Sequence, residues 1–277
     1  VARAAWRAAS QCVWDTAVST PEAGLRPAAR AASWMRRRTS AKRSAMDETA
    51  KAGVVAVMTL SELMAEDART LWATAQALSQ SVALTAAPVS PRPLPPLLFF
   101  TDPERTPRPW ETAARLPAGA GVVYRAFGAA DAVETGLRLR EATRAAGGLL
   151  LVGLDAVLAE RVEADGVHLP ERALSSAYAL SGRRPDWLLT GAAHSEATVR
   201  GARDLHALVL SPVFPAGGAS AAKPALGVKA FSDLAALASC PAYALGGITA
   251  RNAEALSASG ACGLAGVEAI QAAFTSR

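Results

Sequence analysis

From residue 97 onward, short apolar runs alternate with Ala-rich amphipathic stretches, and this alternation limits the fold more than any other feature of the sequence. Each run has the length of a buried strand, and each amphipathic stretch can cover one face of a sheet. This order predicts βα units around a parallel sheet. The eight runs are Leu97–Thr101, Val122–Arg125, Leu149–Gly153, Gly166–Leu169, Leu188–Thr190, Ala207–Ser211, Ala242–Leu245 and Gly263–Val267.

Eight βα units within residues 94–277 suit a compact (β/α)8 TIM barrel, although such barrels usually have about 250 residues. A doubly wound sheet is the alternative, because periodicity alone does not show that a sheet closes. We therefore predict an α/β chain with a (β/α)8 barrel at 94–277 and an N-terminal helical, basic extension.

The chain before the barrel divides into two parts. Residues 47–93 form a predicted helical segment followed by a Pro-rich linker, and we expect a domain boundary at that linker. Residues 1–46 form a basic extension, which we expect to be either disordered or an over-extended reading frame.

The basic charge lies at the head of the chain. The net charge is +5, and residues 1–51 hold ten Lys or Arg against four acidic residues, so the remainder carries −1. A nucleic-acid-binding body would be expected to have its own basic stripe, and we predict no nucleic-acid partner. No apolar run reaches the roughly 18 residues that span a bilayer. Three cysteines without CxxC spacing and the lack of a secretory apolar core favour a cytoplasmic location.

A glycine pair follows the seventh apolar run, at the end of the barrel where active sites are built. Gly246, Gly247 and Ile248 precede a predicted helix at Ala250–Ser259. Glycines let backbone N–H groups approach a ligand, and a helix N-terminus favours an anion. We predict a phosphate site there, with a plain tight turn as the alternative.

Four motifs together resemble one family over residues 94–277. They are Ala164-Asp165-Gly166-Val167-His168-Leu169, the segment Gly191–Ser195, Ser211-Pro212-Val213-Phe214-Pro215, and Gly246-Gly247-Ile248 with Asn252. In this order they resemble the thiamine phosphate synthase / TenI family. The resemblance implies a transferase of thiamine biosynthesis, which joins hydroxymethylpyrimidine diphosphate to a thiazole phosphate and releases diphosphate.

The resemblance also implies roles for particular residues. Arg125 corresponds to a family arginine that follows the second strand, and Asp165 to an aspartate linked to Mg²⁺. Gly247 and Ile248 correspond to the phosphate-binding turn. The implied partners are small phosphate substrates, with Mg²⁺ as cofactor, and a homo-oligomer is left open.

The chain departs from the family pattern at several of these positions. Glu268 stands in place of a phosphate-contacting serine, and Lys223 and Ser220 are the nearest substitute donors for the diphosphate. Gly153-Leu154 replaces the other metal carboxylate, although Asp155 lies beside it. Family residues that grip diphosphate are replaced by Ala216, Gly218 and Ala219.

These departures leave two alternatives beside the synthase. A TenI-like thiazole tautomerase would use His194 as its acid and base, because an imidazole titrates near neutral pH. A non-catalytic paralogue would bind a phosphate ligand and regulate. The candidate catalytic residues are therefore His194, Arg125 and Lys223.

Overall fold

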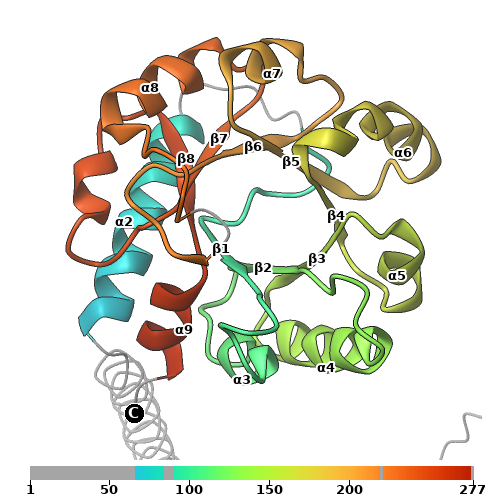
Figure 1. The fold of residues 1–277 in the computed structure, drawn as a ribbon. Coiled ribbons are helices and arrows are strands. Elements are labelled where there is room, and N and C mark those ends of the chain that lie inside the picture. The colour runs from blue at the N-terminus through green and yellow to red at the C-terminus, as the bar shows by residue number, and fades with distance from the viewer. Residues whose placement is uncertain (1–65, 84–89, 219–220, 276–277) are drawn as a thin grey trace, which may run out of the picture. The chain divides into compact units, whose positions relative to one another are not determined.

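The computed structural model describes residues 66–83, 90–218 and 221–275, which contain a closed barrel of eight parallel strands (Figure 1). Each strand pairs with the next in sequence, and β8 returns to pair with β1. This closure confirms the predicted (β/α)8 barrel and excludes the doubly wound sheet. The strands are β1 (Leu97–Phe100), β2 (Gly121–Tyr124), β3 (Leu149–Gly153), β4 (Gly166–Leu169), β5 (Leu188–Ala193), β6 (Ala207–Leu210), β7 (Ala242–Leu245) and β8 (Ala261–Gly266).

The helices form a ring outside the strands (Figure 1). They are α2 (Glu66–Ala83), α3 (Pro109–Ala113), α4 (Ala132–Ala145), α5 (Ala156–Arg161), η1 (Glu171–Ser176), α6 (Ala177–Arg183), α7 (Glu196–Gly201), α8 (Gly227–Leu237), η3 (Ala253–Leu256) and α9 (Glu268–Thr275). In the described part of the chain, no helix is long and apolar enough to cross a membrane.

Alternation along the strands divides the apolar core into two parts. Side chains that point inward fill the barrel, among them Leu98, Phe100, Val123 and Tyr243. The intervening residues point outward and pack under the helices. Because both faces of each strand are buried, the strands are nearly continuous apolar runs, as expected of a parallel sheet.

Helix α2 covers the barrel wall at β8. Only the short helix η3 connects β7 to β8. Its buried residues Ala68, Leu71, Ala75 and Leu78 recur at helical spacing and form one apolar stripe. This helix packs against β8, α9 and η3. Figure 1 shows α2 beside β8 and α9.

The predicted helix at Ala250–Ser259 is wrong in extent, because only the short 3₁₀ helix η3 forms there. Two serine hydroxyls bind backbone carbonyls within this segment: Ser257 bonds to Glu254 and Ser259 to Leu256. Such local bonds compete with helix propagation. The short helix leaves room for α2 in the outer ring.

The basic extension at 1–46 lies outside the described residues, as do residues 47–65 and 84–89. By its contacts the chain divides into Val1–Val57 and Met58–Arg277. Helix α2 therefore belongs to the same unit as the barrel, although the Pro-rich stretch was expected to separate them. The shared apolar core explains this, because α2 buries its apolar stripe against the barrel.

Candidate active site

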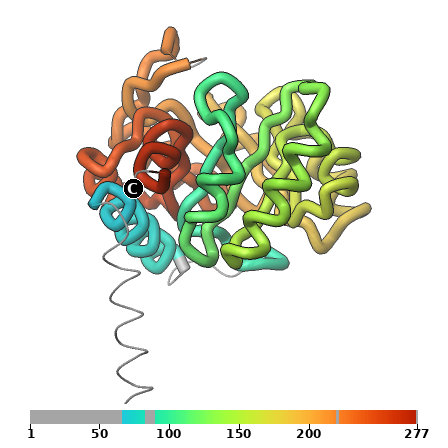
Figure 2. Tube along the Cα trace, turned by 90° about the horizontal axis from the view of Figure 1, so that it is seen from below, coloured from blue at the N-terminus to red at the C-terminus, as the bar shows by residue number. Residues whose placement is uncertain are grey.

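A cavity of about 490 Å³ opens at the end of the barrel where the strands finish. The connections that follow β1, β2, β6, β7 and β8 provide its walls. Figure 2 shows the barrel from the side, with the connection that follows β6 projecting from this end. The lining includes Arg105, Arg125, Ser211, Pro215, Gly217, the turn Gly246–Ile248 and Glu268.

The turn after β7 requires its two glycines. Gly246 and Gly247 have φ values of +103° and +63°, which side-chain-bearing residues rarely adopt. A Cβ on Gly247 would lie 2.3 Å from the carbonyl oxygen of Pro215, so the turn also needs the space. Asn252 holds the turn, since its Nδ2 donates to the Gly247 carbonyl (2.9 Å) and its Oδ1 accepts from the Thr249 N–H (2.8 Å).

The three residues predicted to bind phosphate therefore lie together on the cavity wall. Gly246, Gly247 and Ile248 all line it, although Ile248 itself is buried. Their role in binding phosphate stays a prediction. Ser220, the fourth residue of that set, lies outside the described residues.

Arg125 reaches the same cavity from the end of β2. Its Nε donates to the Thr101 carbonyl (2.7 Å), and its guanidinium lies 3.3 Å from Asp102. The guanidinium also lies over the rings of Phe100 and Phe127, with 5.7 and 5.3 Å to their centroids. Burial lowers the pKa of Arg125 from its ordinary value, and the Asp102 carboxylate opposes this shift.

Asp102, immediately after β1, is shared by two arginines. Its Oδ2 accepts from Arg105 (2.9 Å) and lies 3.3 Å from Arg125, while its Oδ1 accepts backbone N–H bonds from Glu104 and Arg105. Burial tends to raise the pKa of Asp102, but the hydrogen bonds and charges of the arginines outweigh burial and lower it. The carboxylate is thus kept ionised, and it fixes both cations at the cavity wall.

Arg105 is a cavity residue that sequence reasoning missed. Active sites of such barrels are built where the strands finish, and Thr101 and Asp102 lie directly after β1, but Arg105 lies further along the connecting loop. Across the cavity, its Nη1 lies 3.8 Å from Oε2 of Glu268. A long basic side chain within the loop that follows a strand, here five residues after the end of β1, is the signal that could have identified it.

His194 follows β5 and contacts two neighbouring units of the barrel. Its Nδ1 lies 2.8 Å from the carbonyl oxygen of Ser211, so this nitrogen carries the proton and Nε2 is left as the basic atom. Nε2 faces Oε2 of Glu171 at 3.9 Å. Glu171 in turn accepts a hydrogen bond from Thr198. Ser211 belongs to the cavity lining, so His194 lies behind that wall.

His168 lies deeper, in the barrel interior. It is buried, its Nδ1 lies 2.9 Å from Oγ1 of Thr190, and its ring meets Phe100 edge-on at 5.0 Å. Burial lowers the pKa of His168 to about 3, and the charge of Arg125 contributes. The side chain is therefore neutral at physiological pH.

The structure separates Asp165 from the other predicted site residues. Asp165 precedes β4, so it lies at the opposite end of the barrel from the cavity. There its carboxylate accepts hydrogen bonds from Arg140 (2.5 Å), Arg92 (3.0 Å) and the Leu150 N–H (2.9 Å). Both oxygens of this carboxylate accept hydrogen bonds from the protein. The expectation that Asp165 holds Mg²⁺ at the site does not fit this geometry.

Two further candidates lie outside the cavity lining. Lys223 is exposed and is not part of the cavity lining. Asp155 is the N-cap of α5, where it accepts from the Leu158 N–H (2.8 Å). The residues brought together are therefore Arg125 and the glycine turn, with His194 near them.

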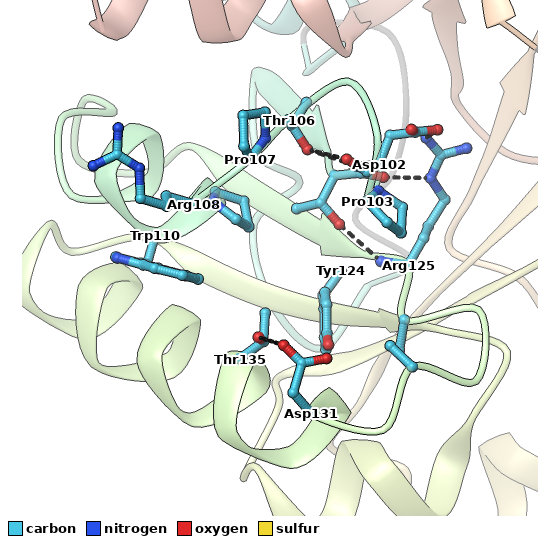
Figure 3. A pocket seen from close by; sticks show the side chains of 14 residues that line it. Asp102, Pro103, Thr106, Pro107, Arg108, Trp110, Tyr124, Arg125, Asp131 and Thr135 are labelled. Carbon is cyan, nitrogen blue, oxygen red and sulfur yellow. Dashed lines mark hydrogen bonds and ion pairs between the residues drawn. The ribbon is translucent and has the colours of Figure 1, made fainter.

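A second, smaller cleft of about 190 Å³ lies beside the cavity, between the connections that follow β1 and β2 (Figure 3). Its lining includes Thr106, Arg108, Trp110, Tyr124 and Asp131. Figure 3 shows Asp102 and Arg125 joined at one side of this cleft. Arg125 lines both spaces, so the Asp102–Arg125 pair forms part of the wall between them.

Comparison with known proteins identifies relatives of this chain. The family described as thiamine monophosphate synthase matches residues 98–270. The chain is 34% identical over 164 residues to the thiamine-phosphate synthase of Methanoculleus marisnigri, covering 57% of this chain and 78% of that protein. It is 32% identical over 163 residues to the thiamine-phosphate synthase of Laribacter hongkongensis, covering 57% and 77% of the two chains.

A solved structure shares the fold. The thiamine phosphate pyrophosphorylase from Pyrococcus furiosus superposes with a TM-score of 0.55 at 23% sequence identity. The match covers 64% of this chain and 91% of that one. At this identity the likeness shows the barrel and not the chemistry.

Proposed function

This chain belongs to the thiamine monophosphate synthase family, and from that premise we propose that it is a transferase of thiamine biosynthesis. The proposed reaction couples hydroxymethylpyrimidine diphosphate to a thiazole phosphate and releases diphosphate. The relatives named thiamine-phosphate synthase support this reaction class. The family fold supports it as well.

One observation carries the proposal: the cavity combines a glycine turn with two arginines at the catalytic end of the barrel. Gly246 and Gly247 let the backbone come close to a bound anion. Arg105 and Arg125 supply guanidinium donors that suit phosphate oxygens. A substrate with phosphate groups meets complementary charge there.

In the proposed reaction, the C–O bond between the pyrimidine methylene and the diphosphate breaks. The thiazole nitrogen then donates its electron pair to that carbon and forms the C–N bond. Negative charge accumulates on the departing diphosphate oxygens, and cationic donors fixed in advance stabilise it most effectively. Arg125, held by the Thr101 carbonyl and Asp102, is such a donor.

The carboxylate expected to bind Mg²⁺ does not lie in this cavity. Asp165 lies at the other end of the barrel, and Asp102 is occupied by two arginines. In the described part of the chain, no three His, Cys, Asp or Glu side chains are placed to hold a metal ion. We therefore assign no step to Mg²⁺, and its requirement is measured directly in the assay below.

The test is a turnover assay on the full chain. Purified protein receives the pyrimidine diphosphate and the thiazole phosphate, with Mg²⁺ or with EDTA, and thiamine phosphate is read as its oxidised fluorescent product. We expect product from the wild type and a rate about 10- to 100-fold lower from Arg125→Ala, because a charge-assisted hydrogen bond is lost. Folded wild-type protein that makes no product would overturn the synthase proposal.

A second candidate, a thiazole tautomerase, is favoured by the geometry of His194. The Ser211 carbonyl fixes the proton on Nδ1, so Nε2 is free to accept one. Moving a proton between ring positions needs no diphosphate. For this candidate, His194→Gln is expected to abolish tautomerisation of a thiazole phosphate, whereas His206→Asn, at the far end of the barrel, retains it. Equal rates in both variants would exclude the tautomerase.

A further inference from the structure

Arg105 is held on one side and loosely paired on the other. On one side, its Nη2 donates to Asp102 at 2.9 Å, and Asp102 is itself fixed by backbone N–H groups. On the other side, Nη1 lies 3.8 Å from Glu268, which is beyond hydrogen-bond distance, and the Glu268 side chain is 58% exposed. The Arg105 guanidinium is therefore fixed in position by Asp102, while its Nη1 makes only a long contact with Glu268.

The connection that follows β6 packs directly on this guanidinium. Gly218 has φ +60°, and a Cβ there would lie 2.7 Å from Cζ of Arg105. The neighbouring Gly217 approaches Glu268, since a Cβ on it would lie 3.8 Å from Oε2. Gly218 thus lets this loop lie on Arg105, while Gly217 lies beside Glu268 at an ordinary contact distance.

The charged side chains of the described cavity lining carry opposite signs, with the positive charge in excess. Arg105 and Arg125 are the two cations of its lining, and Glu268 is the single acid among the described lining residues. Because Glu268 lies at the start of α9, beside the glycine turn in the same lining, its carboxylate repels any anion bound there. Repulsion grows with ligand charge, so it penalises a diphosphate more than a monophosphate.

We propose that Arg105 is an anion-binding residue of this cavity and that Glu268 competes with the ligand for it. Arg105 exchanges its weak contact with Glu268 for a phosphate oxygen of the ligand. Glu268 thereby selects a phosphate monoester over a diphosphate at this end of the cavity. The inference rests on the proposed function in one respect, namely that the cavity is the phosphate-binding site.

Calorimetric titration of the full chain with inorganic phosphate and with inorganic diphosphate tests the proposal. Arg105→Ala is expected to weaken phosphate binding about tenfold or more, as for loss of one hydrogen bond between charged groups. Glu268→Gln is expected to strengthen phosphate binding about threefold and diphosphate binding by a larger factor. In the double variant, the gain from Glu268→Gln is expected to shrink, because its competitor for Arg105 is gone.

The same loop and its neighbouring helix provide matched controls. Arg108 and Glu111 form an exposed pair at 2.9 Å, and neither belongs to the cavity lining. Arg108→Ala and Glu111→Gln are expected to leave both affinities unchanged. A general effect of removing a charge would instead appear in these controls as well.

The outcomes separate this inference from the proposed function. If Glu268→Gln leaves both affinities at the wild-type value, or if Arg105→Ala binds phosphate normally, the inference is wrong. Glu268 is exposed enough that its glutamine variant tests the idea even if Arg105→Ala fails to fold. Wild-type turnover with normal phosphate binding in Arg105→Ala defeats only the inference. Weakened binding without wild-type turnover defeats only the synthase proposal.

Discussion

The two ends of the barrel contain the same chemical unit, one aspartate shared by two arginines, in opposite settings. At the end where the strands begin, here called the closed end, Asp165 binds Arg140 and Arg92. The side chains of Asp165 and Arg140 are only 11% and 9% exposed. At the end where the strands finish, here called the open end, Asp102 binds Arg105 and Arg125, which line the cavity. The residue types do not distinguish the two units.

The difference lies in what remains for a ligand. Asp165 receives hydrogen bonds on both oxygens, including one from the Leu150 backbone, so the closed-end unit joins α4, β3 and the segment before β4. At the open end, Asp102 fixes two guanidinium groups that belong to the cavity lining. From their positions along the strands, we expect one unit to serve stability and the other to serve binding.

The largest expected effect is at the closed end. Asp165→Ala leaves the buried charge of Arg140 unpaired, and we expect the free energy of unfolding to fall by about 3–5 kcal/mol. Chemical denaturation measures this loss. Asp233→Asn, which breaks the exposed pair with Lys229, is the control and should cost less than about 1 kcal/mol.

At the open end, we expect the matching substitution to affect ligand binding more than stability. Asp102→Ala is expected to reduce phosphate affinity more than it reduces stability, because the two arginines lose their anchor but keep access to water. Equal stability losses at Asp102 and Asp165 would show that the two units do not differ as described.

Substitution of one glycine at each end of the barrel tests the same contrast through backbone strain. Gly247→Ala introduces a strained φ and a contact with the Pro215 carbonyl, whereas Gly119→Ala, at the closed end, introduces strain with no atom within 4 Å of the new Cβ. Strain alone costs about 1–3 kcal/mol of stability in both. Only Gly247→Ala is expected to weaken phosphate binding, by about tenfold, in the same calorimetric titration. An equal loss in Gly119→Ala would point to a global change.

The pH dependence of unfolding tests the barrel interior next to the open end. Burial lowers the pKa of His168 to about 3, so below pH 6.5 the unfolded chain takes up a proton that the folded chain refuses. Stability therefore falls by up to about 1.4 kcal/mol for each pH unit between 6.5 and 3. Urea unfolding of His168→Gln between pH 7 and 5 should show a flatter slope.

His206 provides the comparison at the closed end. Burial also lowers its pKa, but the side chain is only half-buried; the Leu189 N–H donates to its Nδ1. His206→Asn is therefore expected to remove a smaller part of the pH slope. If His206→Asn flattens the pH dependence of unfolding more than His168→Gln does, His168 is not the main source of that dependence.

The barrel and the glycine turn could be predicted because both are local patterns. Each strand is a short apolar run, and each run named from the sequence overlaps a strand of the structure. The turn of Gly246 and Gly247 lies directly after one of these runs. The packing of α2 on β8 could not be predicted, because the two segments are far apart in sequence.

The functional residues show where prediction from sequence stops. The family resemblance implies a metal-binding role for Asp165, but Asp165 stands before β4 and therefore lies at the end of the barrel where the strands begin. Arg105 and Glu268 meet only because the barrel closes between β1 and β8. Side-chain reach and closure are properties of the folded chain, so neither contact can be read from spacing.

The smallest expected effect separates burial from charge within the closed-end unit. Arg92 and Arg140 both bind Asp165, but the Arg92 side chain is 40% exposed. Arg92→Ala leaves Asp165 with Arg140 and the Leu150 N–H, so the free energy of unfolding should fall by no more than about 1 kcal/mol. Arg140→Ala should cost several times more in the same denaturation experiment, since Asp165 would then be buried beside a vacated site. Similar losses in both variants would mean that net charge, and not burial, gives the closed end its stability. In that case the contrast with Asp102 would have to rest on the cavity alone.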